Sequence, residues 1–462
     1  MKRFIFIIAT MLATPSIGLA CGGFFCNSAQ PINQAAERIF FAVHDGQMEM
    51  HVRIQYAGPR DDFGWLLPAP AGVDATLSTE ALFDTLDARY GPQFIINPIF
   101  DENCPPPPSA RGGGVDFDGG EEQAGGGGVQ ILSREAVGPY DRAILAAESV
   151  EDLREWLDDN EFAVPAAMDE KLGPYVEMGA HFVAIRLLAD ADSDDIAPLR
   201  LTFPGNSPSI PIVPTSVAAN PDMGVLVHLL GDSRAVPTNY RHVQINEAAL
   251  DLGNGGSNYM DVVAQAVDEA GGHAFATDFA GVIDEGLTNG VRPIDVERIA
   301  EIAVLRDVFE ANIPIDADLQ RVLNPLIMLG DGQSIAQFWN CPFCAEELLD
   351  QPIDGAAVAA RVEAEVNPAR IALTELFSQH RYLTRMYSTL NPEEMVLDPA
   401  FAFNRDLADV SNIHQIDVQF ECGNNGEADT TRGTLINAAG NTGEVDMTGE
   451  TAVQRQGGQT IR

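Results

Sequence analysis

Two cysteines separated by two residues form the pattern with the clearest chemical potential. Cys341-Pro342-Phe343-Cys344 has the spacing of redox sites in which a helix N-terminus stabilises the thiolate and lowers the thiol pKa. In redox enzymes such a pair directly follows a β-strand, and residues 334–340 lack a strand pattern. A zinc site would need two more ligands, and neither a second Cys-x-x-Cys nor a His-x₃₋₅-His occurs. The sequence favours a structural disulfide, and a thiol–disulfide oxidoreductase using Cys341 and Cys344 is the alternative.

An acidic run is the second candidate site. Asp190, Asp192, Asp194 and Asp195 alternate in a way that can converge on a hard cation such as Ca²⁺. A helix–loop–helix calcium site requires glycine at its sixth position and glutamate at its twelfth, where this chain has Asp195 and Leu201. We therefore interpret the run as a solvated turn between strands.

Linear catalytic motifs are absent from the chain. There is no Gly-x-Ser-x-Gly, no His-Glu-x-x-His and no phosphate-binding Gly-x₄-Gly-Lys loop. We assign no catalytic residue, cofactor or metal ligand, and we favour a non-enzymatic role. A hydrolase built from residues gathered in space remains a third hypothesis, because a missing linear motif does not exclude a constellation formed by folding.

The N-terminus has the pattern of an export signal. Lys2 and Arg3 precede the apolar stretch 4–13, and Gly18-Leu19-Ala20 places small residues for cleavage after Ala20. This predicts a signal peptide over residues 1–20 and a periplasmic or secreted protein. The alternative is a lipoprotein anchored at Cys21, but Gly18 stands where lipoprotein signals carry leucine.

Cysteine parity supports disulfide formation. In an oxidising compartment an even number of cysteines can all pair, whereas lipidation of one would leave another unpaired. Closeness in sequence favours Cys21–Cys26 and Cys341–Cys344, which leaves Cys104–Cys422 to close a long loop. The six disulfide candidates are Cys21, Cys26, Cys104, Cys341, Cys344 and Cys422.

The net charge restricts the classes of partner. A formal charge of −41 repels nucleic acid and anionic lipid, so we exclude both as main partners and leave an envelope component or a protein as the partner class. After the signal peptide, no apolar run approaches the roughly 18 residues of a membrane-spanning helix.

The N-terminal half has the alternating pattern of β-strands. Residues 38–43 and 48–56 flank Asp45-Gly46, which predicts a β-hairpin. Helices are predicted at 81–90 and 150–157. Further strands are predicted at 63–68, 181–188, 199–203, 210–213, 225–230 and 242–245. We expect a sandwich-like β-rich part over residues 21–250, with a flexible Gly/Pro-rich insert at 105–128.

Farther along the chain the apolar period changes from 2 to 3.6. The spacing predicts a mainly helical domain over residues 255–422. The helical positions are Met260, Val263, Val267, Ile299, Ile302, Leu305, Phe309, Leu373, Leu376, Phe377, Leu383, Met386, Tyr387 and Leu390. Residues 423–462 are rich in Gly, Thr, Asn and Gln, which predicts a disordered tail. The predicted fold class is α+β, with an antiparallel β-rich part followed by a helical part.

Several segments resemble an exported bacterial family known as domain of unknown function 2330. The similar segments are 21–26 (CGGFFC), 34–39 (QAAERI), 51–58 (HVRIQYAG), 63–68 (FGWLLP) and 382–387 (YLTRMY). The resemblance implies export and a mature chain that begins at Cys21. It implies no activity, cofactor or catalytic residue. We therefore expect an uncharacterised cell-envelope or secreted protein that serves as a binding or structural module.

Overall fold

The computed structural model describes residues 34–54, 63–101, 130–160, 162, 165–188, 196–217, 219–330, 332–423, 428–436, 442–447 and 458–461. The signal peptide, the Gly/Pro-rich insert and the acidic run at 190–195 lie outside the described residues, as do Cys21, Cys26 and Cys104. Those predictions are not tested by the structure.

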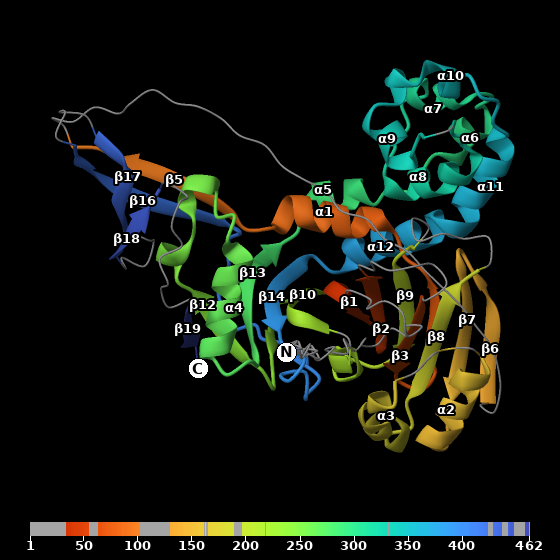
Figure 1. Cartoon of the computed structure of the whole chain (residues 1–462), viewed down its shortest axis with the longest axis horizontal. Helices are drawn as coiled ribbons and strands as arrows, with labels where there is room; N and C mark the ends of the chain where they lie inside the picture. Colours follow the sequence, from red (N-terminus) through yellow and green to blue (C-terminus); the bar gives the residue numbers. More distant parts are fainter. Residues whose placement is uncertain are drawn as a thin grey trace, which may run out of the picture.

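A nine-stranded mixed sheet runs through the middle of the structure (Figure 1), in the order β19-β12-β13-β14-β10-β1-β2-β9-β4. β1 pairs in parallel with β10, and β12 with β13, while the other neighbours are antiparallel. The strands are β1 Gln34–His44, β2 Gln47–Ile54, β4 Asp74–Leu77, β9 Leu199–Pro204, β10 Ala219–Gly231, β12 Arg241–Ile245, β13 Ala274–Val282, β14 Tyr382–Leu390 and β19 Gly458–Ile461.

Three smaller sheets complete the β structure. One has the order β3-β8-β7-β6, another the order β18-β17-β16-β5, and β11 pairs with β15. Their strands are β3 Gly64–Ala69, β5 Gln93–Ile99, β6 Gln130–Val137, β7 Tyr140–Ala146, β8 His181–Leu187, β11 Ala235–Pro237, β15 Phe401–Phe403, β16 Ile413–Cys422, β17 Ala428–Ile436 and β18 Thr442–Asp446.

The predicted hairpin is confirmed and begins the central sheet. β1 and β2 pair from His44↔Gln47 onward, and the turn residues Asp45 and Gly46 have φ of 48° and 76°. Two consecutive positive φ values match the turn that suits the twist of paired strands, for which Asp-Gly is favoured. Local turn chemistry therefore sets the register of these two strands.

Alternate residues of β1 enter two different cores. Ile39 and Phe41 pack with Trp65 of β3 and Ile185 of β8, between the central sheet and one smaller sheet. Phe40 faces the other way, toward the helices α1 Glu80–Tyr90, α5 Glu285–Gly290 and α12 Asn367–Gln379. Because successive strand residues point to opposite faces, both faces of β1 are buried.

Three further helices cover other apolar surfaces of the sheets. α2 Val150–Asp159 and α3 Ala167–Glu177 pack on the outer face of the β3-β8-β7-β6 sheet. α4 Tyr259–Glu269 packs against β12, β14 and β19. The 3₁₀ turns are η2 Pro214–Val217, η3 Glu247–Ala249, η4 Leu252–Asn254, η5 Asn324–Leu326 and η6 Pro342–Cys344.

Six helices form a lobe with its own core at one end of α1 (Figure 1). Leu305, Val322 and Val362 are buried inside it. Its helices are α6 Val296–Ala300, α7 Leu305–Glu310, α8 Ala317–Leu323, α9 Ile335–Asn340, α10 Glu346–Leu349 and α11 Gly355–Glu365. The spacing of Ile299, Ile302, Leu305 and Phe309 predicted helix here, and the structure divides that stretch between α6 and α7.

The helical prediction for residues 383–390 is wrong. Leu383, Met386, Tyr387 and Leu390 belong to β14, which lies between β10 and β13 in the central sheet. Eight of its nine residues are buried, so apolar residues occupy both faces and their spacing imitates a helical period. The strand predicted at 210–213 is also wrong, because no strand forms there.

The predicted disordered tail contains strands. β17 and β18 extend the sheet that begins with β5 and β16, and β19 pairs with β12. Leu435 and Val445 are buried in the core of that sheet, which compensates for the polar composition around them. The α+β class is confirmed, with strands first and most helices later. The sandwich-like packing and the domain boundaries stay predictions.

Candidate functional site

A cleft of about 760 Å³ opens between α1 and the helical lobe. One wall is α1, and the other consists of residues 289–298 and 312–316. Arg370 of α12 also lines it. The volume lies within the range of roughly 300–1,000 Å³ typical of small-molecule sites.

Glycines in α5 allow that helix to lie directly against α1. A Cβ atom at Gly286 would overlap the guanidinium of Arg89, and one at Gly290 would overlap the side chain of Thr85. The Arg89 guanidinium is the end of a flexible side chain and can move aside, whereas Thr85 is short, so a larger residue at Gly290 would push α5 away from α1. Gly290 therefore allows the close approach of α5 to α1 at this end of the cleft.

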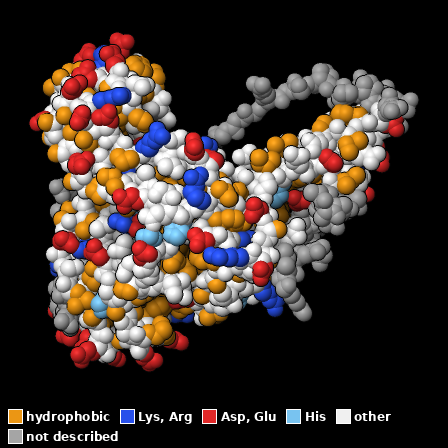
Figure 2. Space-filling view, turned by 180° about the vertical axis from the view of Figure 1, so that it is seen from behind, with side chains coloured by type: hydrophobic (Ala, Val, Ile, Leu, Met, Phe, Trp, Pro, Cys, Tyr) orange, Lys and Arg blue, Asp and Glu red, His pale blue; other side chains and the backbone are white. Residues whose placement is uncertain are grey.

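The lining of the cleft is rich in arginine, although the protein as a whole is strongly acidic. Four arginines and three aspartates line it, a formal excess of one positive charge, whereas the whole chain carries −41. Figure 2 shows Asp and Glu side chains spread over the outer surface of the molecule. The lining charges are Arg89, Arg292, Arg298, Arg370, Asp84, Asp295 and Asp316.

Most of these charges are paired. Arg298 lies 3.0 Å from Asp295, and Arg89 lies 3.3 Å from Asp284 across an exposed contact. Exposed pairs of this kind are worth at most about 1 kcal/mol. Arg292 is exposed, and its guanidinium contacts no carboxylate among the described residues. It is therefore the arginine most available to a bound anion.

A buried ion cluster forms the floor of the cleft. Arg370 donates to Asp318 at 2.5 Å and to Asp316 at 2.8 Å. Burial alone would raise the pKa of Asp318, but Arg370 and the hydroxyl of Thr79 hold it below its usual value. Burial lowers the pKa of Arg370, but its two carboxylate partners raise it above the ordinary value. The cluster is therefore charged at neutral pH.

Asp318 also caps α1 from a distant part of the chain. Its carboxylate accepts the Thr79 hydroxyl and the backbone N–H groups of Glu80, at 3.1 Å, and Ala81, at 3.4 Å. The first N–H groups of a helix have no partner within the helix and attract negative charge. α8 thus supplies the cap that α1 lacks locally, and this contact joins the lobe to α1.

A second ion pair lies beside this cap. Arg53 of β2 lies 2.7 Å from Glu80 and 2.8 Å from Asp84. Burial raises the pKa of Glu80 to about 7, although Arg53 opposes the shift. Glu80 therefore changes charge near neutral pH at the N-terminus of α1.

A serine, a histidine and a glutamate form a hydrogen-bonded chain under α1. Ser78 lies 2.6 Å from His51 Nδ1, and His51 Nε2 lies 2.9 Å from Glu49. The residue types are those of a hydrolase triad, but Ser78 and His51 are both fully buried. Glu49 is also bound by Arg200 at 2.6 Å. The enclosure favours a structural role that ties β2, β4 and β9 together.

A comparison with models of protein families shows which family the chain belongs to. A model described as "Uncharacterized protein conserved in bacteria (DUF2330)" matches residues 15–309, more than half of the chain. The chain belongs to this family. Neither a curated protein nor a solved structure matches the chain.

The match to the domain of unknown function 2330 confirms the resemblance and covers the α1 wall of the cleft and part of the opposite wall. Residues 15–309 include Arg53, Glu80 and the wall up to Arg298. Asp318 and Arg370 lie beyond the matched residues, as does the segment 382–387. Among the described residues, no helix combines the length and apolar composition needed to cross a membrane.

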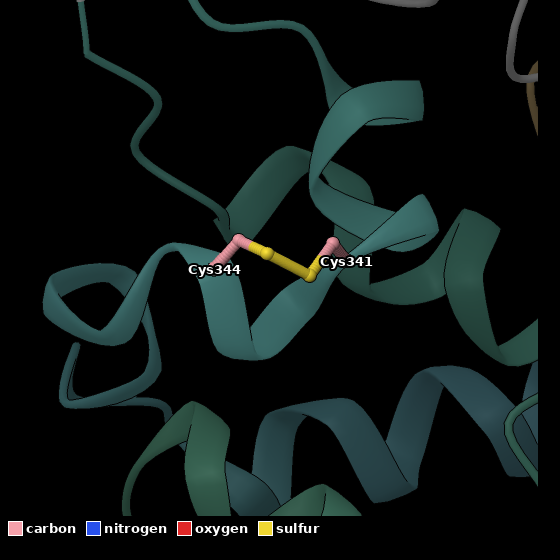
Figure 3. The surroundings of a disulfide bond; sticks show 2 residues. All are labelled: Cys341 and Cys344. Atoms are coloured by element: carbon pink, nitrogen blue, oxygen red, sulfur yellow. A yellow bond between two sulfur atoms is a disulfide. The ribbon is translucent and has the colours of Figure 1, made fainter.

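In this family member, Cys341 and Cys344 form a disulfide in the helical lobe (Figure 3). Both cysteines are exposed. Cys341 follows the last residue of α9 and precedes the 3₁₀ turn η6, so the pair does not lie at the N-terminus of a longer helix. The geometry gives the thiolate no helix dipole, and the oxidoreductase hypothesis gains no support.

Replacing both cysteines by serine should have a small effect. The disulfide closes a loop of only a few residues, for which the chain-entropy relation gives about 2 kcal/mol. We expect Cys341→Ser/Cys344→Ser to lower the free energy of unfolding by about that amount, measured by urea denaturation. Insulin reduction that is present in the wild type and lost in this variant would instead support the redox hypothesis.

Of the other predicted disulfide candidates, only Cys422 lies in the described part of the chain. Cys422 is disulfide-bonded and, because Cys341 and Cys344 pair with each other, its partner lies outside the described residues. The pairs Cys21–Cys26 and Cys104–Cys422 therefore stay predictions. Within the described part of the chain, no three His, Cys, Asp or Glu side chains are grouped so that they could hold a metal ion.

No linear motif contains the cleft residues, because they come from distant segments of the chain. Arg370 had one usable signal, since it lies between Ala369 and Leu373 on a helix whose inner positions are apolar. A charged side chain at such a position indicates a buried ion pair. The sequence did not indicate that Asp316 and Asp318 are its partners.

Proposed function

We propose that this chain is an exported binding module that holds a small anionic ligand in the cleft between α1 and the helical lobe. The N-terminal pattern at residues 1–20 supports export to the periplasm or beyond the cell. The arginine-rich lining of the cleft, with an exposed Arg292 that contacts no carboxylate among the described residues, carries the ligand assignment. An arginine without a carboxylate partner attracts anions that the acidic surface elsewhere repels.

The lining favours a ligand with carboxylate or phosphate groups. Arginine presents a planar fork of donors that matches these groups. Asn289, Asn312 and Thr85 add neutral polar groups to the same walls. The proposed ligand class is a small molecule with two or more such anionic groups, of which citrate and a sugar phosphate are suitable probes.

We assign binding rather than catalysis to this cleft. The residue types closest to a catalytic constellation, Ser78, His51 and Glu49, are enclosed beneath α1, where a substrate does not reach the serine hydroxyl. The charged groups of the cleft are arginine and aspartate, which suit recognition of an anion.

Arg292→Gln tests the proposal. We expect wild-type protein to bind citrate or glucose 6-phosphate in isothermal titration, and glucose to give no heat. A charge-assisted hydrogen bond contributes about 1.5–3 kcal/mol, so the variant should bind about 10-fold to 100-fold more weakly. Stability should be unchanged, because Arg292 is exposed and its guanidinium pairs with no carboxylate among the described residues.

Arg405→Gln is the matched control. Arg405 is exposed and lies 3.6 Å from Asp232, outside the cleft. This variant removes the same charge and should bind the anion as the wild type does. Equal weakening in both variants would indicate a general effect of charge. Failure of all the anions to bind, or tighter binding of glucose, would overturn the proposal.

A further inference from the structure

The Cys341–Cys344 disulfide closes a short turn that presents a phenylalanine to solvent. Phe343 lies between the two cysteines in the 3₁₀ turn η6, and it is 60 % exposed. Its ring lies 5.4 Å from that of Phe309 of α7, and the ring of Phe309 lies 6.2 Å from that of Trp339 of α9. An exposed aromatic side chain therefore rests on two half-buried ones.

Exposed aliphatic side chains extend this aromatic group. The indole N–H of Trp339 donates to Asn324 at 2.8 Å, which joins η5 to α9. Leu326 ends η5, the exposed Met328 and Leu329 follow it, and Met328 is 68 % exposed. A single exposed apolar residue is normal, but a connected group of them marks an interaction site. We call this group the lobe-tip patch, which consists of Phe309, Leu326, Met328, Leu329, Trp339 and Phe343.

The lobe-tip patch is held in position by other parts of the lobe. Gln351 accepts from the backbone N–H of Met328 at 2.9 Å and donates to its carbonyl at 3.0 Å. The disulfide fixes the turn that carries Phe343 (Figure 3). Side chains that are already ordered lose less conformational entropy when a partner binds. The patch is therefore prepared for binding.

The carboxylates beside the patch are unpaired. Glu310 ends α7, and Glu346 and Glu347 begin α10 directly after the disulfide. All three are exposed and form no ion pair in the described part of the chain. Arg306 of α7 is already bound to Asp350 at 2.8 Å. The apolar surface therefore has an acidic rim, which is complementary to a basic partner.

This charge distinguishes between the possible occupants of the patch. A second copy of the chain would bring the same carboxylates against the rim, and a membrane with anionic headgroups would be repelled. A protein segment with lysine or arginine beside its apolar side chains is attracted by both parts of the surface.

We propose that the lobe-tip patch docks a partner protein through a basic amphipathic segment. The apolar side chains of that segment cover Phe343 and Met328, and its basic side chains face Glu346 and Glu347. The Cys-x-x-Cys pair then has the role of presenting Phe343. Figure 1 places α7 and α10 on the side of the lobe away from the central sheet, so the docking surface is separate from the cleft at α1 and does not depend on its ligand.

Phe343→Ser tests the docking surface in the full exported chain. The probe is a dye-labelled synthetic peptide of leucine and lysine that folds as an amphipathic helix, and fluorescence anisotropy measures its binding. We expect the variant to bind the peptide about 10-fold more weakly than the wild type, because an aromatic anchor is lost while the charge is unchanged. The Tm should stay the same, since Phe343 is mostly exposed.

Met178→Ser is the matched control and should bind the peptide as the wild type does. Met178 is an exposed apolar residue at the end of α3, outside the lobe. A peptide of the same composition without an apolar face should bind the wild type about 10-fold more weakly than the amphipathic one.

Two further variants test the rim and the turn. Glu346→Gln/Glu347→Gln should weaken binding about 5-fold and reduce its dependence on salt. Cys341→Ser/Cys344→Ser should weaken it about 3-fold, because the freed turn must then be ordered on binding. Equal binding by Phe343→Ser and the wild type would indicate diffuse attraction to an acidic chain and would overturn the proposal. So would a wild-type dimer in sedimentation that Phe343→Ser abolishes, because the occupant would then be a second copy.

Discussion

Replacing Asp318 by asparagine is expected to lower the free energy of unfolding by about 3–5 kcal/mol. Asp318 is fully buried and accepts from Arg370 at 2.5 Å, so the change leaves a buried guanidinium with Asp316 as its remaining close carboxylate. The asparagine amide also presents hydrogens toward α1, where the N–H groups of Glu80 and Ala81 require an acceptor. Urea denaturation at neutral pH measures the loss through the shift of the midpoint.

Asp350→Asn provides the matched control for that experiment. Asp350 pairs with Arg306 at 2.8 Å, but its side chain is 68 % exposed. We expect a change of no more than about 1 kcal/mol. If Asp318→Asn cost as little as this control, the cluster beneath the cleft would not hold the lobe against α1, and the charges of Arg370 and Asp318 would be solvated.

The second large expected effect is a change in the free energy of unfolding that Glu80 causes and that depends on pH. The pKa of Glu80 is about 7 in the folded protein against an ordinary value of 4.5. Between these values the folded state binds a proton that the unfolded state has lost, so stability falls as pH rises through this window. Above pH 7 both states are ionised, and burial of the carboxylate then costs about 3 kcal/mol.

Glu80→Gln removes the ionisable group and should remove this penalty. We expect the variant to be more stable than the wild type by about 3 kcal/mol at pH 8, and the difference to disappear near pH 4.5. Urea denaturation between pH 4.5 and pH 8 measures this difference in stability.

Asp84→Asn is the matched control. It removes the other carboxylate that Arg53 contacts, which is half-exposed, and it should change stability by no more than about 1 kcal/mol at pH 8. A Glu80→Gln variant less stable at pH 8 would show that the pair with Arg53 outweighs burial.

Local features of the fold could be predicted from the sequence where one segment sets its own geometry. The Asp45-Gly46 turn and the alternation around it determine the β1–β2 hairpin, and Val262, Val263, Ala266 and Val267 give α4 one buried face. β14 could not be recognised in the same way. Its buried residues face two different cores, so no alternation of apolar and polar residues marks it as a strand.

The candidate site was less predictable than the fold. Asp318 and Thr79, which share a hydrogen bond, are 239 positions apart. No spacing in the sequence connects them, and neither lies in a linear motif. The same holds for Phe309 and Phe343, whose rings become neighbours only in the folded lobe. The Cys-x-x-Cys pair, which sequence spacing does reveal, lies exposed on the lobe.

The sequence by itself determined the α+β class, the acidic surface and the affiliation with the domain of unknown function 2330, because composition, local turn chemistry and sequence similarity act over short stretches. The tertiary structure alone decided which charges meet. A buried arginine needs a carboxylate partner, and the fold supplies it from whichever segment packing brings close. For Arg370 that segment is α8.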